Sequence, residues 1–185
     1  KSLHTYINGV FSIMSELRTN RIVPRDGLVS GTGIGGGIIQ IKQTIKKDQF
    51  TSGNTTSNYD DIDGLNVTIT PTRSDSKILI ECSIYNSNAN AVNFFRVLRG
   101  STFIEQPSGT SSSGAGYNAH GFAYYNCNNW QDTTVIKILD SPATISATTY
   151  KVQCAVTSGT CTINKFYGTS NYYGISTITA MEVSG

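Results

Sequence analysis

Beyond Pro24 the chain alternates apolar and polar residues in short runs that are separated by turn residues. This period of two, together with frequent Val, Ile, Thr and Tyr, is typical of half-buried β-strands. The pattern predicts ten strands, at residues 38–45, 65–70, 77–85, 91–98, 102–105, 119–126, 133–139, 149–156, 161–166 and 175–183. Two long connections are expected, at 51–64 and at 106–118, and the second is rich in Gly and Ser.

No helical pattern separates any two of these runs, so parallel βαβ units are excluded. Ten strands in the length that remains predict an antiparallel sandwich or barrel. We therefore expect an all-β domain over residues 38–185.

The first residues follow a different period. Apolar residues recur there at alternating spacings of four and three, as in the a/d seam of a coiled coil: Leu3, Ile7, Val10, Met14 and Leu17. The seam predicts a helix over 3–17, which must end near Asn20 because Pro24 restricts the preceding residue to extended geometry. The helix either packs on its own domain or ends a longer coiled-coil stalk, and we expect the stalk, as residues 1–20.

The stretch GTGIGGG follows, with glycines at Gly31, Gly33, Gly35, Gly36 and Gly37. It contains the G-x-G-x-x-G pattern of dinucleotide-binding loops, but such a loop needs a following helix and an acidic residue about 20 positions later. Here a strand-like run follows, and position 53 is glycine. We therefore interpret residues 21–37 as a neck in which three chains approach closely, with a flexible linker as the alternative.

Composition narrows the classes of function. Charged residues make up 14% of the chain and the net charge is +2, which is too small to indicate nucleic-acid binding. No apolar run is long enough for a membrane-spanning helix, so no membrane insertion is expected. Residue 1 is Lys and no signal-peptide pattern follows, so we expect a fragment or processed chain with further sequence upstream.

Residues that could carry catalysis are few. Neither His4 nor His120 lies near a nucleophile motif, and Glu81 has no evident partner for a glycosidase pair. We therefore expect no enzyme activity and no cofactor. The segment YDDIDG offers Asp60, Asp61 and Asp63 as a weak calcium candidate, but it lacks the distal Glu of a calcium loop, so a solvated turn without metal is expected.

The four cysteines form no C-x-x-C pair, which argues against a zinc site. Cys82 and Cys154 lie in apolar strand-like runs and are expected to be buried as small hydrophobic residues. A bridge between Cys154 and Cys161 across a hairpin remains an alternative.

Two clusters combine aromatic rings with amide groups, which suits the C–H faces and hydroxyls of a saccharide. The candidate receptor- or glycan-binding residues are Tyr124, Tyr125, Asn128, Asn129, Trp130, Asn171, Tyr172 and Tyr173. Both clusters are expected at strand ends or loops, where binding residues concentrate. The alternative is that these rings fill the core or a trimer interface, where Tyr and Trp are also enriched.

Three further stretches carry a resemblance: FFRVLRGSTFI (94–104), VIKILDSPATISATTYKVQCAV (135–156) and GISTITAMEVSG (174–185). They resemble the C-terminal domains of bacteriophage fibre and tail-fibre proteins, particularly those of marine phages, over roughly residues 65–185. The resemblance implies a jelly roll similar to tumour necrosis factor and the complement heads, built as a homotrimer on a helical or collagen-like stalk.

The resemblance implies that the protein forms the tip of a virion fibre. Such a tip would join other virion proteins upstream and attach the particle to a host-surface glycan or protein. The motifs are turns and strands, so no binding residue is carried over. Two alternatives stay open, a purely structural virion appendage and a eukaryotic-type trimeric ligand of the same fold, although the C-terminal motif argues against the second.

Overall fold

The computed structural model describes residues 37–55, 58–108, 118–125, 130–168 and 171–184. These residues belong to the second of two units of the chain, Gly36–Gly185. The helix predicted over 3–17 and the neck glycines Gly31, Gly33, Gly35 and Gly36 lie outside the described residues. Gly37 is exposed, and a Cβ added there would meet no atom of its own chain within 4 Å.

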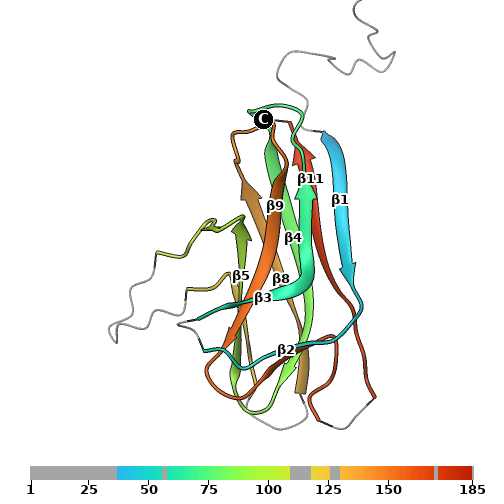
Figure 1. Cartoon of the computed structure of the whole chain (residues 1–185), viewed down its shortest axis with the longest axis vertical. Helices are drawn as coiled ribbons and strands as arrows, with labels where there is room; N and C mark the ends of the chain where they lie inside the picture. The colour runs from blue at the N-terminus through green and yellow to red at the C-terminus, as the bar shows by residue number, and fades with distance from the viewer. Residues whose placement is uncertain (1–36, 56–57, 109–117, 126–129, 169–170, 185) are drawn as a thin grey trace, which may run out of the picture. The chain divides into compact units, whose positions relative to one another are not determined.

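The described residues form eleven strands in two antiparallel sheets (Figure 1). The strands are β1 (Ile38–Lys46), β2 (Phe50–Ser52), β3 (Asp60–Ile69), β4 (Lys77–Asn88), β5 (Val92–Arg99), β6 (Thr102–Phe103), β7 (Gly121–Tyr124), β8 (Trp130–Asp140), β9 (Thr148–Val156), β10 (Cys161–Ile163) and β11 (Ser176–Val183). The six-stranded sheet has the order β1-β11-β4-β10-β2, with β8 on the other side of β4. The five-stranded sheet has the order β3-β9-β5-β6, with β7 also paired to β5.

All ten predicted strands are present, and the antiparallel all-β prediction is confirmed. The prediction of a long connection over 51–64 is wrong, because it contains the end of β2 and the start of β3. The pairing of β3 with β9 shifts between Asp61 and Asn66, and Gly64 within this bulge has a φ of 72°. The bulge breaks the alternation of apolar residues, and so it hid the first half of the strand.

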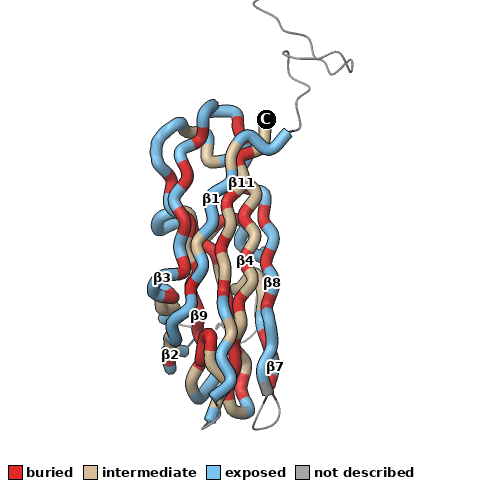
Figure 2. The backbone as a smooth tube through the Cα atoms, turned by 90° about the vertical axis from the view of Figure 1, so that its right-hand side faces the viewer, coloured by how far each residue is buried: buried red, intermediate tan, exposed pale blue. Residues whose placement is uncertain are grey.

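The two sheets pack face to face through the inward residue of each alternating pair. Fully buried side chains come from both sheets and include Leu65, Ile80, Phe95, Tyr150 and Ile178. Residues facing the core alternate with exposed ones along the strands, as β8 shows in Figure 2.

The predicted burial of the cysteines is confirmed, since Cys82 and Cys154 lie in the core. Cys161 is also buried, and both it and Cys154 are free thiols, so the alternative of a bridge between them is not realised. Burial raises the pKa of the Cys82 thiol to about 12, so this thiol stays protonated.

An ion pair and a phenol join the two sheets near one end of the sandwich. Arg99 of β5 donates from one Nη to both carboxylate oxygens of Asp140 on β8, at 2.8 and 2.7 Å. The Tyr150 hydroxyl of β9 donates to the same carboxylate at 2.6 Å. Because Asp140 is buried, these contacts supply the partners that its charge requires.

A second buried carboxylate, Glu182 of β11, fastens the last strand to its surroundings. Gln40 Nε2 donates to it at 2.6 Å, and the backbone N–H and hydroxyl of Thr72 each donate at 2.7 Å. Burial alone would raise the pKa of Glu182, but these hydrogen bonds outweigh it and lower the pKa to about 2. Glu182 therefore stays ionised and ties β1 and the segment before β4 to β11.

We predict that Glu182→Gln lowers the free energy of unfolding at pH 7 by about 2 kcal/mol, because an amide cannot accept from every donor present. The folded-state pKa of Glu182 lies below its reference value of 4.5, so its contribution is complete above pH 4.5 and is lost as the pH falls towards 2. Urea unfolding at several pH values should therefore show the difference between the two proteins shrinking over that interval.

Glu81→Gln is the matched control, because the Glu81 side chain is 39% exposed and forms only a surface ion pair with Lys137. It should change the free energy of unfolding by at most about 0.5 kcal/mol. A loss of similar size in both variants would contradict the role given to Glu182.

Candidate interaction surfaces

The outer face of the six-stranded sheet carries an apolar row that crosses four strands. The register aligns Ile41 of β1 with Met181 of β11, Met181 with Leu79 of β4, and Leu79 with Leu139 of β8. On β4, β8 and β11 the neighbours Ile78, Ile80, Ile138 and Ala180 lie in the core, so the row faces outward. Ile41 is 56% exposed and Leu139 is 47% exposed, although both are large apolar side chains.

The two outermost of these four strands, β1 and β8, each carry a second exposed apolar residue four positions from the first. Ile45 of β1 and Val135 of β8 are both exposed and lie at the two ends of the row that also contains Thr177 and Ser83. The row between is polar, with Gln43 bound to Thr179 at 2.9 Å and Lys137 paired with Glu81 at 3.3 Å. The face thus has one apolar row, a polar row beside it, and then a row that is apolar only at its two ends.

The outer face of the five-stranded sheet has the opposite character. Its row across β3, β9 and β5 consists of Asp61, Gln153 and Arg96. Gln153 donates to Asp61 at 2.7 Å, and Lys151 on the same face donates to that carboxylate at 2.8 Å. Charge and amide groups therefore cover this part of the face, whereas the exposed rings of Phe122 and Tyr124 lie on it at β7.

An exposed apolar face of this kind marks a surface that another molecule covers. Monomeric sheets that face water place polar residues on that side, as the five-stranded sheet does. Ile41 and Ile45 belong to β1, which among the described residues pairs only with β11, and edge strands with exposed apolar residues also favour association. The six-stranded sheet is therefore the candidate surface for assembly.

The predicted aromatic cluster at Tyr172 and Tyr173 lies in the segment between β10 and β11. Both rings are exposed, as is Asn171. In Figure 1 this segment lies at the end of the sandwich opposite the C-terminus. Gly37 and Ser184 are hydrogen-bonded neighbours, so the chain enters and leaves the sandwich at the other end.

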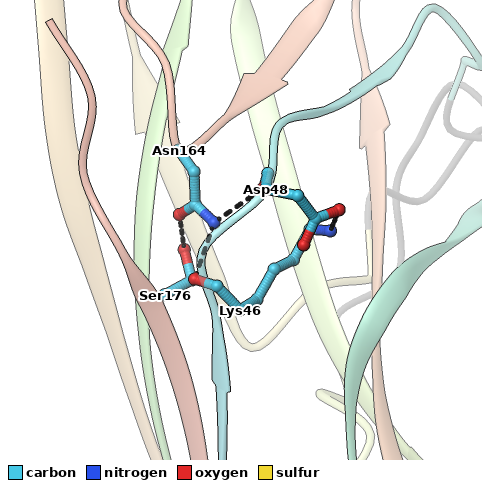
Figure 3. Close-up of polar contacts among 4 residues, drawn as sticks. All are labelled: Lys46, Asp48, Asn164 and Ser176. Carbon is cyan, nitrogen blue, oxygen red and sulfur yellow. Dashed lines mark hydrogen bonds and ion pairs between the residues drawn. The ribbon is translucent and has the colours of Figure 1, made fainter.

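A buried asparagine fixes the start of this segment, as Figure 3 shows. Asn164 Nδ2 donates to the carbonyls of Lys46 and Asp48 at 2.9 and 3.0 Å, and Ser176 Oγ donates to Asn164 Oδ1 at 2.6 Å. The backbone carbonyl of Asn164 accepts from Gly174 at 3.1 Å. Asn164 adopts a φ of 61°, which Asn tolerates better than most residues. The two ends of the tyrosine segment are thereby held together.

Of the other predicted cluster, Tyr124 is exposed at the end of β7, but the interpretation of Tyr125 as a binding residue is wrong. Tyr125 is 1% exposed, and its hydroxyl donates to Asn86 Oδ1 at 2.6 Å and to the Asn86 carbonyl at 3.0 Å. Consecutive residues near a strand point to opposite faces, so only one of this pair faces solvent. Asn128, Asn129 and the Trp130 side chain lie outside the described structure.

The acidic residues proposed as a weak calcium candidate do not converge. Asp60 accepts from Ser52 Oγ and Asn54 Nδ2, both at 2.6 Å, whereas Asp61 accepts from Lys151 and Gln153. Within the described ranges no three acidic, histidine or cysteine side chains form a group that could hold a metal ion. His120 is engaged as well: the Val97 N–H donates to its Nδ1 at 2.9 Å, and Nε2 lies 2.8 Å from the Ile104 carbonyl.

Among the residues that the structure describes, no helix is long and apolar enough to cross a membrane. No protein-family model matches the chain. No curated protein matches it either.

Two solved structures show a distant likeness. One is the tripod (BppUct-A-L) from the baseplate of bacteriophage Tuc2009, at 12% identity and a TM-score of 0.34, covering 98% of this chain and 90% of that one. The other is from infectious bursal disease virus Gx strain, at 12% identity and a TM-score of 0.38, covering 87% of this chain and 44% of that one. This chain thus spans less than half of the second protein, and at these scores neither likeness establishes a shared fold.

We predict that Asn164→Ala lowers the free energy of unfolding by about 3 kcal/mol, because it removes buried hydrogen bonds and places Ala at positive φ. Asn90→Ala is the matched control: Asn90 is exposed at a φ of 52°, so only the backbone strain of about 1 kcal/mol applies. Asn164→Gly should lose less free energy of unfolding than Asn164→Ala, because glycine adopts positive φ without backbone strain. Equal losses for Asn164→Ala and Asn90→Ala in urea unfolding would show that the side-chain contacts in Figure 3 contribute nothing.

Proposed function

We propose that this protein is the homotrimeric tip of a virion fibre, folded as a jelly roll, which attaches the particle to a host-surface receptor. The observation that carries the proposal is the row of exposed apolar side chains across the outer face of the six-stranded sheet, whereas the row of Asp61, Gln153 and Arg96 on the other sheet is polar. A chain with one such face is suited to assembly around an axis, with the polar face outward.

The strand order supports the jelly roll. The long strands β3, β4 and β5 alternate between the two sheets, and so do β8, β9 and β11. This alternation is the connectivity of two interlocked Greek keys. The stretches that resemble phage fibre domains also coincide with the β5–β6 hairpin, with β8 and β9, and with β11.

Two features support a trimer. The predicted seam of Leu3, Ile7, Val10, Met14 and Leu17 would bring helices together upstream of the sandwich. The exposed apolar row of the six-stranded sheet offers a second surface for self-association. A closed ring of three copies would cover this face on every copy. An open filament would leave the face exposed on the copy at its end.

The attachment role places the receptor contacts at the end of the sandwich far from Gly37 and Ser184. Exposed Tyr124, Asn171, Tyr172 and Tyr173 offer aromatic rings and an amide there. The segment with three of these residues is held at both ends by Asn164, which fixes its shape before any ligand arrives. Binding, without catalysis or a cofactor, is the activity that we propose.

We predict that the full chain sediments as a trimer at micromolar concentration and that Ile41→Glu combined with Leu139→Glu makes it a monomer. The two substitutions place charges at both ends of one apolar row, where burial would cost several kcal/mol. Thr68→Glu, on the outer face of the five-stranded sheet, should leave the trimer intact.

A trimer that persists in the double variant would show that this face is not required for assembly. Ile7→Asp with Val10→Asp then tests whether the predicted helical seam holds the chains together. A wild-type monomer under the same conditions would overturn the trimer.

We predict that Tyr172→Ala and Tyr173→Ala each weaken binding of the labelled chain to bacterial cells and to a glycan array, by at least about tenfold. Both rings are exposed, so their removal should not change the melting temperature. Ile145→Ser is the control, since Ile145 is an exposed apolar residue between β8 and β9. If the wild-type chain binds neither cells nor glycans, attachment is excluded and a structural appendage on head or tail remains.

A further inference from the structure

One arginine on the outer face of the five-stranded sheet is held between aromatic rings. The Arg96 guanidinium lies 3.9 Å from the centre of the Tyr59 ring and 5.4 Å from that of Phe103. Phe103 packs in turn against His120, with ring centres 4.8 Å apart. The faces of the guanidinium are thereby shielded from water, while it keeps its charge.

A chain of hydrogen bonds fixes the orientation of this guanidinium. Arg96 Nε donates to Gln153 Oε1 at 2.7 Å, and Gln153 Nε2 donates to Asp61 at 2.7 Å. Lys151 completes the chain through its ion pair with Asp61 at 2.8 Å. Since the charges of Lys151 and Asp61 cancel, the positive charge of Arg96 is left over on this face.

Arg96 differs from the other two arginines in the described ranges. Arg73 pairs with Asp75 and Arg99 pairs with Asp140, whereas Arg96 has no carboxylate within ion-pair distance. Burial lowers the pKa of the Arg96 guanidinium, against the opposing effects of Tyr59 and Asp61. A cation that has lost part of its hydration without gaining a counter-ion favours the binding of an anion. Its two Nη groups form a fork that matches a carboxylate.

Two exposed aromatic rings continue the same face away from Arg96. Phe122 and Tyr124 of β7 are 69% and 66% exposed. Phe122 is the register partner of Phe94, which lies two residues from Arg96 on β5, so Phe122 and Arg96 are diagonal neighbours about 7 Å apart. Tyr124 follows Phe122 on the same face after about 6.8 Å. Arg96 and the two rings therefore form one line of positions along this face, with Arg96 Nε bonded to Gln153 on the side of β5 away from β7.

We infer that this line, Arg96–Phe122–Tyr124, binds an acidic oligosaccharide, with a sugar carboxylate on the Arg96 fork and the C–H faces of sugar rings on Phe122 and Tyr124. Open, one-sided aromatic platforms suit the C–H face of a pyranose ring, and the Arg96 guanidinium suits a sugar carboxylate. His120 is occupied by backbone groups on both nitrogens, so Arg96 supplies the charge. The site shares Tyr124 with the proposed receptor contacts and so extends the proposed function, whereas Arg96 and Phe122 belong to this site alone.

The test is calorimetry or saturation-transfer NMR on the full chain with trigalacturonate and sialyllactose. Their neutral counterparts are methyl-esterified trigalacturonate and lactose, and acetate tests the carboxylate alone. We expect at least one acidic sugar to bind in the millimolar range, at least about tenfold more tightly than its neutral counterpart and than acetate. Arg96→Gln should reduce this affinity at least about tenfold, and Arg96→Lys should restore only part of it.

Phe122→Ser keeps the test valid if Arg96 variants fail to fold, because Phe122 is exposed. It should weaken binding several-fold, whereas Ile145→Ser and Arg73→Gln should not change it. The inference is overturned if neither acidic sugar binds, if neutral sugars or acetate bind equally well, or if Phe122→Ser has no more effect than Ile145→Ser. If only the Tyr172 and Tyr173 variants lose cell binding, the inference about the Arg96 site still stands.

Discussion

The register between β4 and β8 is the constraint on which the rest of the sandwich depends. The two strands pair without interruption from Ile78 with Asp140 to Asn88 with Trp130. β4 is also paired on its other side, with β11 and β10, so it connects most of the six-stranded sheet. A slip of β8 by one residue would turn Ile138 out of the core and Leu139 into it, while Ile80 and Leu79 of β4 kept their places. The same ladder therefore sets both the core and the apolar outer face.

The two outer faces divide the chemistry of the domain. Hydrophobic rows lie on the six-stranded sheet, whereas charges, amides and the shielded Arg96 lie on the five-stranded one. Assembly through the outer face of the six-stranded sheet would leave two surfaces open to ligands. These are the outer face of the five-stranded sheet and the exposed side chains of Tyr172 and Tyr173. Folding, association and recognition would then use separate sets of residues, so variation in one set need not disturb the others.

Sequence pattern predicted the strands well, because period-two alternation survives wherever one side of a strand is buried. It missed β2, which has three residues, and the start of β3, where the bulge at Gly64 changes which side faces the core. It could not separate Tyr124 from Tyr125, because their directions depend on the pairing of β7 with β5. Nor could it find Arg96, whose environment is built by Tyr59, Phe103 and Gln153 from distant segments.

The position of β11 has a consequence for the order of events during synthesis. β11 lies between β1 and β4, so β1 has no partner until residues 176–183 have left the ribosome. Ile41 can join the row with Leu79 and Leu139 only when β11 has inserted between them. A chain that is still being made thus lacks the completed apolar face, and a truncated one never acquires it. Association through that face would select for chains that contain β11, without any separate proofreading step.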